Sequence, residues 1–209
     1  MRDLREAITY AKADGTLTCG QLLEVASFLK ASDEIRRAIS KARSAGSPLV
    51  DETEPDVCAY ADKLETSDKL LEKIETSILG QDEVSDKASR ELSSIRRERK
   101  NIASGIRSLL DRVIANHADM LQEGIVTLRE GRYCIPVKAD FNGRIEGIVH
   151  GASSSGQTLF IEPMSVVEAN NKIAELTFAE QAEIQRILKS FTNEVVSISP
   201  LLENNMEIA

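Results

Sequence analysis

Two long stretches of apolar residues at alternating three- and four-residue spacing constrain this chain more than any other feature. The first runs from Asp86 to about Asp119, and the second begins after Pro163. This spacing is typical of a coiled-coil seam, and each helix would reach roughly 50 Å. Two such helices are too long to be buried in one compact globule, so they are expected to pair antiparallel and to project. The apolar positions are Leu92, Ile95, Ile102, Ile106, Leu109 and Val113 in the first stretch, and Val166, Val167, Ile173, Leu176, Ile184, Ile187, Leu188, Phe191 and Val195 in the second.

Polar side chains interrupt this seam at Arg99 and Asn170, and such groups can fix the register between paired helices. The first stretch is also the most basic part of the chain, with Arg96, Arg97, Arg99, Lys100, Arg107 and Arg112. These cations are expected to be solvated or to pair with glutamates of the returning helix, such as Glu175, Glu180 and Glu183. The alternative is that they face DNA.

The segment before the seam predicts a helical base. Apolar spacing indicates a short helix over Asp3–Ala13, closed by a turn at Asp14-Gly15. Thr18 stands three residues before Gln21, which predicts a capping box at the start of a second helix that ends before Gly46-Ser47-Pro48. A third, less regular helical stretch runs from Val57 to Ile78, and Gly80 is placed to terminate it.

A β-like insert separates the two seam helices. Alternating apolar residues predict strands at 125–128, 133–138, 145–150 and 157–161. Turns are expected at Glu130-Gly131 and Asn142-Gly143, and a loop at 151–156. Pro136 cannot donate a ladder hydrogen bond, so its strand is expected at an edge or a bulge.

The predicted organisation is therefore mainly α: a helical base and a long antiparallel helical hairpin that carries a small antiparallel sheet. The boundaries are 1–84 for the base, 85–120 for the ascending helix, 121–163 for the sheet, 164–200 for the returning helix and 201–209 for a continuation. Neither end resembles a natural boundary, so the chain is interpreted as a piece of a longer protein.

Composition excludes several classes of function. The formal net charge of −8 argues against a protein that coats nucleic acid through bulk positive charge, so any such contact must be local. Three separated cysteines and two histidines predict neither a disulfide framework nor a metal site. No apolar run is long enough to span a bilayer and no signal peptide precedes the first helix, which indicates a cytoplasmic protein without membrane contact.

The insert carries the most specific motifs of the chain. The runs GRYCIPVK at 131–138, GRIEGIVH at 143–150 and SGQTLFIEP at 155–163 resemble the clamp region of the type-two MutS family, bacterial paralogues of the mismatch-repair protein MutS. The following VVEANN at 166–171 is similar to the start of that family's returning lever helix. The first half of the chain shares only helical character and order with the family.

The resemblance implies a fold and a set of activities. Members of this family are dimeric ATPases that bind branched or irregular DNA, restrain recombination and carry a C-terminal nuclease domain, and some are linked to rescue of stalled ribosomes. ATP and Mg²⁺ are thus cofactors that the resemblance implies for the full-length protein, together with homodimerisation. This sequence contains no phosphate-binding loop of the ATPase type, so no cofactor is expected here.

Candidate DNA-binding residues follow from the resemblance and from local charge. Arg129, Arg132, Lys138 and Arg144 could meet phosphates singly, although Glu130, Asp140 and Glu146 lie among them and ordinary solvation is the alternative. Ser153, Ser154 and Ser155 could cradle a phosphate or simply form a turn. His150 lies near these serines, but no nucleophile elbow or orienting carboxylate is evident, so no catalytic residue is expected.

These observations predict a non-catalytic DNA-clamping and lever region of a MutS-like ATPase. In a dimer, two such regions would close around DNA, with weak, salt-sensitive and largely sequence-independent contacts. The acidic net charge leaves a second hypothesis open, in which the chain is a helical interaction module that grips the ribosome or a protein partner.

Overall fold

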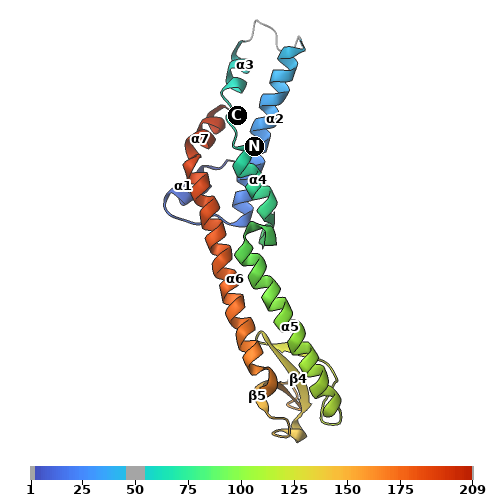
Figure 1. Ribbon diagram of the computed structural model, residues 1–209. Helices are drawn as coiled ribbons and strands as arrows, with labels where there is room; N and C mark the ends of the chain where they lie inside the picture. Colours follow the sequence, from blue (N-terminus) through green and yellow to red (C-terminus); the bar gives the residue numbers. More distant parts are fainter. Residues whose placement is uncertain (1–2, 46–54, 209) are drawn as a thin grey trace. The chain divides into compact units, whose positions relative to one another are not determined.

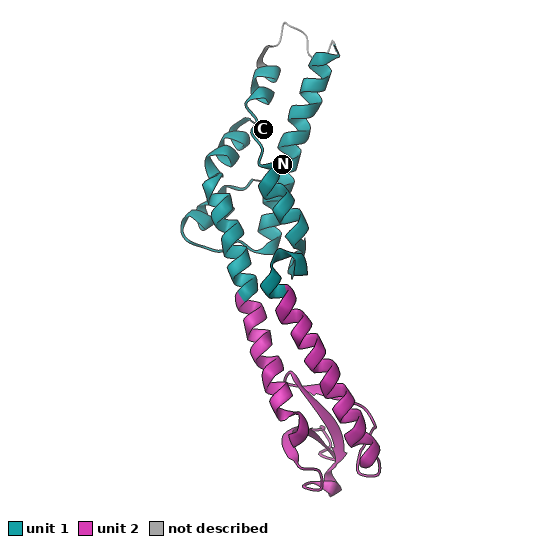
Figure 2. Ribbon diagram, viewed as in Figure 1, with its two compact units in different colours: residues 1–92, 183–209 teal, residues 93–182 magenta. Residues whose placement is uncertain are grey.

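The computed structural model describes residues 3–45 and 55–208 and is mainly helical with small antiparallel sheets (Figure 1). The prediction of a mainly α chain is confirmed. Two compact units are distinguished in Figure 2: residues 1–92 with 183–209, and residues 93–182. Within the described ranges, no helix is both long enough and apolar enough to cross a membrane.

The first unit begins with α1 (Arg5–Lys12) and α2 (Cys19–Ser44), as the apolar spacing predicts. Thr18 forms the predicted capping box: its hydroxyl accepts from the Gln21 amide at 3.2 Å, and the Gln21 side chain accepts from the Thr18 amide at 3.0 Å. These two bonds satisfy backbone donors that the first helical turn leaves open. The helix ends at Ser44 with Ala45 as its C-cap, before Gly46 as predicted, and Gly46-Ser47-Pro48 themselves lie outside the described residues.

The prediction of one third helix ended by Gly80 is wrong. The chain forms α3 (Pro55–Asp62) and α4 (Asp68–Ser77), and then a hairpin of β1 (Ile78–Gly80) and β2 (Glu83–Val84). Between the two helices, Asn205 of α7 (Ser199–Ile208) accepts from the Glu65 amide at 3.1 Å and donates to the Glu65 carbonyl at 2.7 Å. A distant side chain thus satisfies backbone groups that a continuous helix would have paired internally.

The first unit has its own hydrophobic core. Buried side chains of α1, α2, α4 and the β1–β2 hairpin pack with the second half of α6 (Met164–Ser197). Thr192 of α6 is fully buried, donates to the Leu188 carbonyl at 2.8 Å and accepts from the Leu17 amide at 3.0 Å. The α6 residues in this core include Ile187, Leu188, Phe191 and Val195, all predicted as seam positions.

The second unit contains a four-stranded antiparallel sheet in the order β3-β4-β6-β5. Its strands are β3 (Thr127–Arg129), β4 (Arg132–Lys138), β5 (Gly147–Ala152) and β6 (Thr158–Pro163). The predicted turn at Glu130-Gly131 is present, with φ of 49° and 78°, the left-handed values that a two-residue hairpin turn of this kind requires. A 3₁₀ turn, η3 (Ala139–Phe141), follows β4.

Pro136 does not place its strand at an edge, because β4 pairs with β3 on one side and β6 on the other. The carbonyl of Pro136 accepts from the Gln122 amide at 3.0 Å. Since the nitrogen and carbonyl of one strand residue point to the same side, the Pro136 nitrogen faces this irregular segment and not β6. The ladder with β6 therefore loses no donor.

The apolar faces of α5 (Arg90–Asn116) and α6 within residues 93–182 differ from a simple coiled-coil seam. Ile106 and Leu110 of α5 belong to one core with Ile135 and Val137 of β4, so this part of the stripe packs with the sheet. Leu110 is fully buried, whereas the predicted seam residue Leu109 is only half-buried. The buried positions of α5 are therefore spaced as on an amphipathic helix that packs with one face on a sheet.

Candidate nucleic-acid interface

Charge is distributed unevenly between the two units. Residues 93–182 contain eleven Lys and Arg and eleven Asp and Glu, so their formal charge is zero. The remaining residues therefore carry the whole net charge of −8. Phosphate would be repelled less by residues 93–182 than by the rest of the chain.

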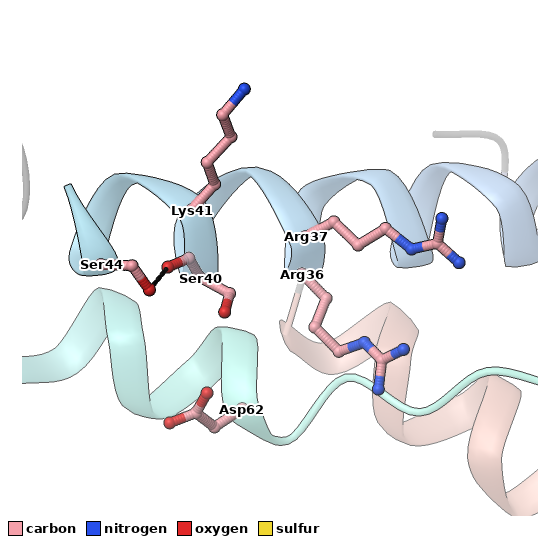
Figure 3. Close-up of a pocket in the computed structure, with 6 residues that line it drawn as sticks. All are labelled: Arg36, Arg37, Ser40, Lys41, Ser44 and Asp62. Carbon is pink, nitrogen blue, oxygen red and sulfur yellow. Dashed lines mark hydrogen bonds between the residues drawn. The ribbon is translucent and has the colours of Figure 1, made fainter.

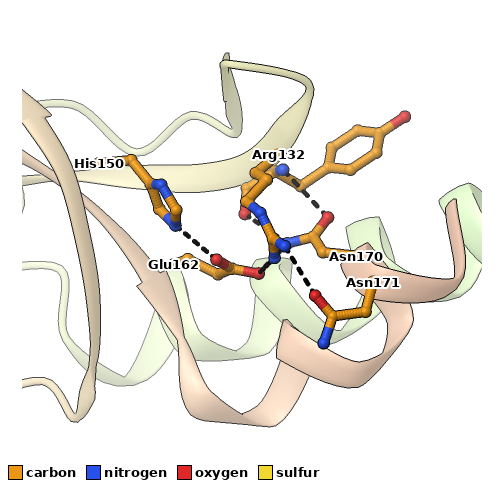
Figure 4. A network of polar contacts seen from close by, with 6 residues as sticks. Arg132, His150, Glu162, Asn170 and Asn171 are labelled. Carbon is orange, nitrogen blue, oxygen red and sulfur yellow. Dashed lines mark hydrogen bonds and ion pairs between the residues drawn. The ribbon is translucent and has the colours of Figure 1, made fainter. Parts of the chain in front are cut away.

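A buried carboxylate organises the outer polar side chains of the sheet (Figure 4). Glu162 of β6 is fully buried, and its Oε1 lies 2.7 Å from Nη1 of Arg132 on β4. Its Oε2 lies 2.5 Å from Nε2 of His150 on β5. The second arm of the Arg132 guanidinium donates to Oδ1 of Asn171 at 2.6 Å. Arg132, predicted to meet DNA, is thus engaged inside the protein.

Asn170 completes this network from α6. Its Oδ1 accepts from the Tyr133 amide at 3.1 Å, and its Nδ2 donates to the Tyr133 carbonyl at 3.2 Å and to Glu162 at 2.8 Å. The carboxamide thereby pairs with β4 beyond the last residue pair of the β4–β6 ladder, Ile135 and Ile161, as a further strand residue would. Asn170 joins α6 to the sheet, so the prediction that it sets the register between two helices is wrong.

His150 does have an orienting carboxylate, Glu162, which the sequence reasoning missed. However, no hydrogen bond joins His150 to Ser153, Ser154 or Ser155 among the described contacts. Ser153 instead accepts from the Thr158 amide at 3.2 Å and closes the turn between β5 and β6. Ser154 and Ser155 remain exposed at this turn.

The Cys134 thiol lies buried in β4. Desolvation and the nearby Glu162 raise its pKa to about 11, although Arg132 and Arg129 act in the opposite direction. A thiol with this pKa is almost entirely protonated at neutral pH, and only the thiolate is a good nucleophile or metal ligand. Cys134 is therefore a core residue.

The other predicted cations of the sheet differ in how they are held. The Arg129 guanidinium lies 3.6 Å from the centroid of the Phe160 ring. Lys138 donates to the Asp119 carbonyl at 2.8 Å. Arg144 is exposed and follows a turn closed by its own amide, which donates to the Phe141 carbonyl at 3.0 Å. In the described residues, the side chains of Arg129 and Arg144 have no ion-pair or hydrogen-bond partner.

Basic residues of α5 pair with α6 as predicted, but through one glutamate. Glu180 is mostly buried; its Oε1 lies 2.7 Å from Arg96 and its Oε2 lies 2.5 Å from Arg99. The Arg99 contact is ionic without the alignment of a hydrogen bond. Glu183 pairs within α6 with Arg186, and this hydrogen bond lowers the Glu183 pKa. The prediction for Glu175 is wrong, since it pairs with Lys172.

A second group of cations lines a cleft between α2 and α3 in the first unit (Figure 3). Arg36 and Arg37 pair with Asp33 at 2.9 and 2.7 Å. Asp62, on the opposite wall, is bound by Arg43, whose hydrogen bonds lower the Asp62 pKa. The remaining lining residues are Ser40, Lys41 and Ser44. Asp33 and Asp62 thus offset two of the four cations, and the cleft lies in the unit that carries the whole net negative charge, which makes it a weaker phosphate site than the sheet.

The cations of the sheet are evident in the sequence, but their partners are not. Phe160 and Glu162 stood in the quoted motif, yet nothing in the residue pattern aligned β4 with β6. The register pairs Pro136 with Phe160 and Ile135 with Ile161. The alternation of outward residues along both strands could have placed Arg132 and Glu162 on one face once that register was known.

Comparisons with known proteins identify the family. No protein-family model matches the chain. It is 39% identical over 209 residues to the protein named Endonuclease MutS2 from Ruminiclostridium cellulolyticum, covering 99% of this chain and 26% of that protein. It is 37% identical over 210 residues to Endonuclease MutS2 from Acetivibrio thermocellus, covering 100% of this chain and 26% of that protein. It is 38% identical over 195 residues to Endonuclease MutS2 from Clostridium beijerinckii, covering 93% of this chain and 24% of that protein. The chain thus spans about a quarter of the length of these relatives, and across that region it belongs to the type-two MutS family.

Proposed function

We propose that residues 93–182 form a non-catalytic DNA-contacting region of a type-two MutS protein, and that Arg129 and Arg144 make the main phosphate contacts. The observation that carries this proposal is the stacking of Arg129 on Phe160. Stacking holds the guanidinium plane by one face and leaves its N–H groups free at the edge, where they can donate to phosphate oxygens. Arg144 adds a second free cation on the same sheet module.

Arg132 and Lys138 have a different role in this proposal. Arg132 neutralises the buried Glu162, and Lys138 holds the chain near Asp119. Both therefore support the shape of the sheet, and neither needs to touch DNA. The exposed Ser154 and Ser155 supply at most additional hydroxyl contacts at the β5–β6 turn.

In the full-length protein, we propose that two copies of this region close around branched or irregular DNA. An ATPase with bound ATP and Mg²⁺ would drive this closure from a part of the protein outside the chain, as a hinge-type change, and the activity would restrain recombination. The relatives are named endonucleases, and we assign the nuclease to a part of the protein outside these residues. Because the proposed contacts reach phosphates and not base edges, binding is expected to depend on salt more than on sequence.

The test is a titration of labelled four-way-junction and linear duplex DNA, followed by fluorescence anisotropy at several salt concentrations. The variant Arg129→Glu/Arg144→Glu is expected to bind at least about tenfold more weakly at low salt and to show a salt slope smaller by about two. A matched control is Lys69→Glu/Lys87→Glu, which changes the net charge equally at exposed lysines of the first unit outside the α2–α3 cleft.

Equal loss of binding in both double variants would show a bulk charge effect and would contradict a contact on the sheet. Loss in the Lys138→Glu variant alone, with Arg129→Glu/Arg144→Glu unaffected, would also contradict the assignment. Preserved binding in the control beside weakened binding in the arginine variant is the expected pattern.

A protein or ribosome partner is the second candidate function. Exposed apolar side chains on the edge strands favour it, since Leu128 of β3 and Ile148 and Val149 of β5 are 57%, 43% and 47% exposed. Such side chains suit protein contact better than phosphate contact. Co-sedimentation with ribosomes, compared between the wild-type chain and Ile148→Ser/Val149→Ser, tests this candidate.

A further inference from the structure

A hollow of about 470 Å³ opens within residues 93–182 beside the β3–β4 hairpin. Its walls come from α5, the hairpin and α6, and its volume lies within the range of about 300–1,000 Å³ common for small-ligand sites. None of its residues belongs to the Glu162 network except Tyr133, which joins that network only through its backbone. The lining residues are Arg96, Arg99, Lys100, Ala103, Leu128, Gly131, Tyr133, Ile173 and Thr177.

The α5 wall of the hollow carries a surplus of positive charge. Arg96 and Arg99 both contact the carboxylate of Glu180. Lys100 is exposed and has no ion-pair or hydrogen-bond partner in the described part of the chain. This wall therefore favours a ligand with an anionic group.

The rest of the lining is mostly apolar and aromatic. Leu128, Ala103 and Ile173 supply aliphatic surface, and Tyr133 supplies an aromatic residue whose ring centroid lies 6.0 Å from the Arg107 guanidinium. A flat aromatic group can pack on such a surface, and unpaired bases bind proteins by stacking on aromatic rings. A nucleotide combines this flat group with a phosphate that matches Lys100.

The hollow also adjoins the proposed phosphate contact. Leu128 lines the hollow, and the next residue of β3 is Arg129, whose side chain lies over Phe160. Successive residues of a strand point to opposite faces of a sheet. DNA bound at Arg129 would therefore lie on one face of the β3–β4 hairpin, and the hollow borders the other face.

We propose that this hollow accepts one unpaired nucleotide of the bound DNA, with the base against Tyr133 and Leu128 and the phosphate at Lys100. This inference rests on the proposed DNA-contacting function and adds a reason why irregular DNA would be preferred over regular duplex. Only an unpaired or unstacked base can leave the base stack of the DNA and enter the hollow, because a paired base is held by pairing and stacking.

The experiment uses two short duplexes that contain 2-aminopurine, one with the modified base unpaired and one with it paired. The whole chain is expected to bind the first about tenfold more tightly, a preference within the range of stacking on an aromatic ring. The emission of the unpaired 2-aminopurine should change on binding as the base stacks on Tyr133. Ala103→Leu, which extends a side chain into the hollow, should abolish the preference and the emission change without weakening duplex binding.

Ala115→Leu is the matched control, because it makes the same substitution at an exposed position of α5 outside the hollow. Lys100→Gln should reduce the preference while duplex affinity changes little. Equal binding of the two duplexes, or an emission change that survives Ala103→Leu, would overturn the hollow as the site while leaving the DNA-contacting function standing. Absence of binding to both duplexes would overturn the proposed function and this inference together.

Discussion

Glu162→Ala is expected to lower the free energy of unfolding of residues 93–182 by about 3–5 kcal/mol, the usual result of breaking a buried ion pair from one side. Glu162 is fully buried and accepts from Arg132, Asn170 and His150 at 2.5–2.8 Å. Without the carboxylate, the Arg132 charge loses its ion-pair partner and the Asn170 amide loses one of its two acceptors, in a site with little access to water. The cost comes from the uncompensated groups more than from the lost contacts.

Hydrogen exchange followed by mass spectrometry measures this effect segment by segment and so separates the two units. Faster exchange is expected in β4, β5 and β6, with no change in α1 and α2. Glu168→Ala, which removes an exposed carboxylate from the same helix, serves as the control. A loss below about 1 kcal/mol for Glu162→Ala would mean that water or another side chain satisfies the network, in contradiction to the full burial of Glu162.

Leu110→Ala is expected to destabilise residues 93–182 by about 2–5 kcal/mol, because it removes a fully buried side chain from the core shared by α5 and the sheet. Leu109→Ala is the paired control. Leu109 is only half-buried, so its truncation should cost clearly less, about 1 kcal/mol.

The two leucines are adjacent, so this comparison determines which face of α5 covers the sheet. Urea-induced unfolding, with hydrogen exchange to assign the affected unit, measures both variants. If Leu109→Ala proved the more costly substitution, the helix would have the rotation that a coiled-coil spacing predicts. The assignment of Leu110 to the face of α5 that packs with the sheet would then be wrong.

Local signals predicted much of this fold correctly. The capping box at Thr18 and Gln21 and the left-handed turn at Glu130-Gly131 depend on neighbouring residues alone, and both are present. The four strands of the sheet lie within two residues of their predicted bounds. Helix content follows from apolar spacing, which long helices display over many turns.

The errors have a common cause, which is contact between residues far apart in the chain. The third predicted helix breaks at Glu65, whose backbone pairs with Asn205, 140 residues away. Pro136 can lie in an interior strand because its nitrogen faces the irregular segment at Gln122, whose amide donates to the Pro136 carbonyl. Leu110 is buried in place of Leu109 because α5 packs with a sheet. Periodicity within one segment contains no information on any of these partners.

The candidate site was predictable in its residue types but not in its pairing. Four cations were expected on the sheet, and charge alone could not distinguish Arg132, which neutralises Glu162, from Arg129, which stacks on Phe160. The hollow beside Tyr133 was missed entirely, since its walls come from three elements separated in sequence. Strand register supplies the missing information for the cations, and the packing of α5 and α6 beside the hairpin supplies it for the hollow.

The most direct test of the central claim, that DNA meets the sheet at Arg129 and Arg144, is two-dimensional NMR of the isotope-labelled chain with junction DNA added stepwise. We expect the largest changes at the side-chain Nε–H signals of these two arginines and at the backbone amides around them, with the α2 signals unchanged. Changes confined to α2, or an unaffected Arg129 signal in a chain that binds the DNA, would contradict this claim.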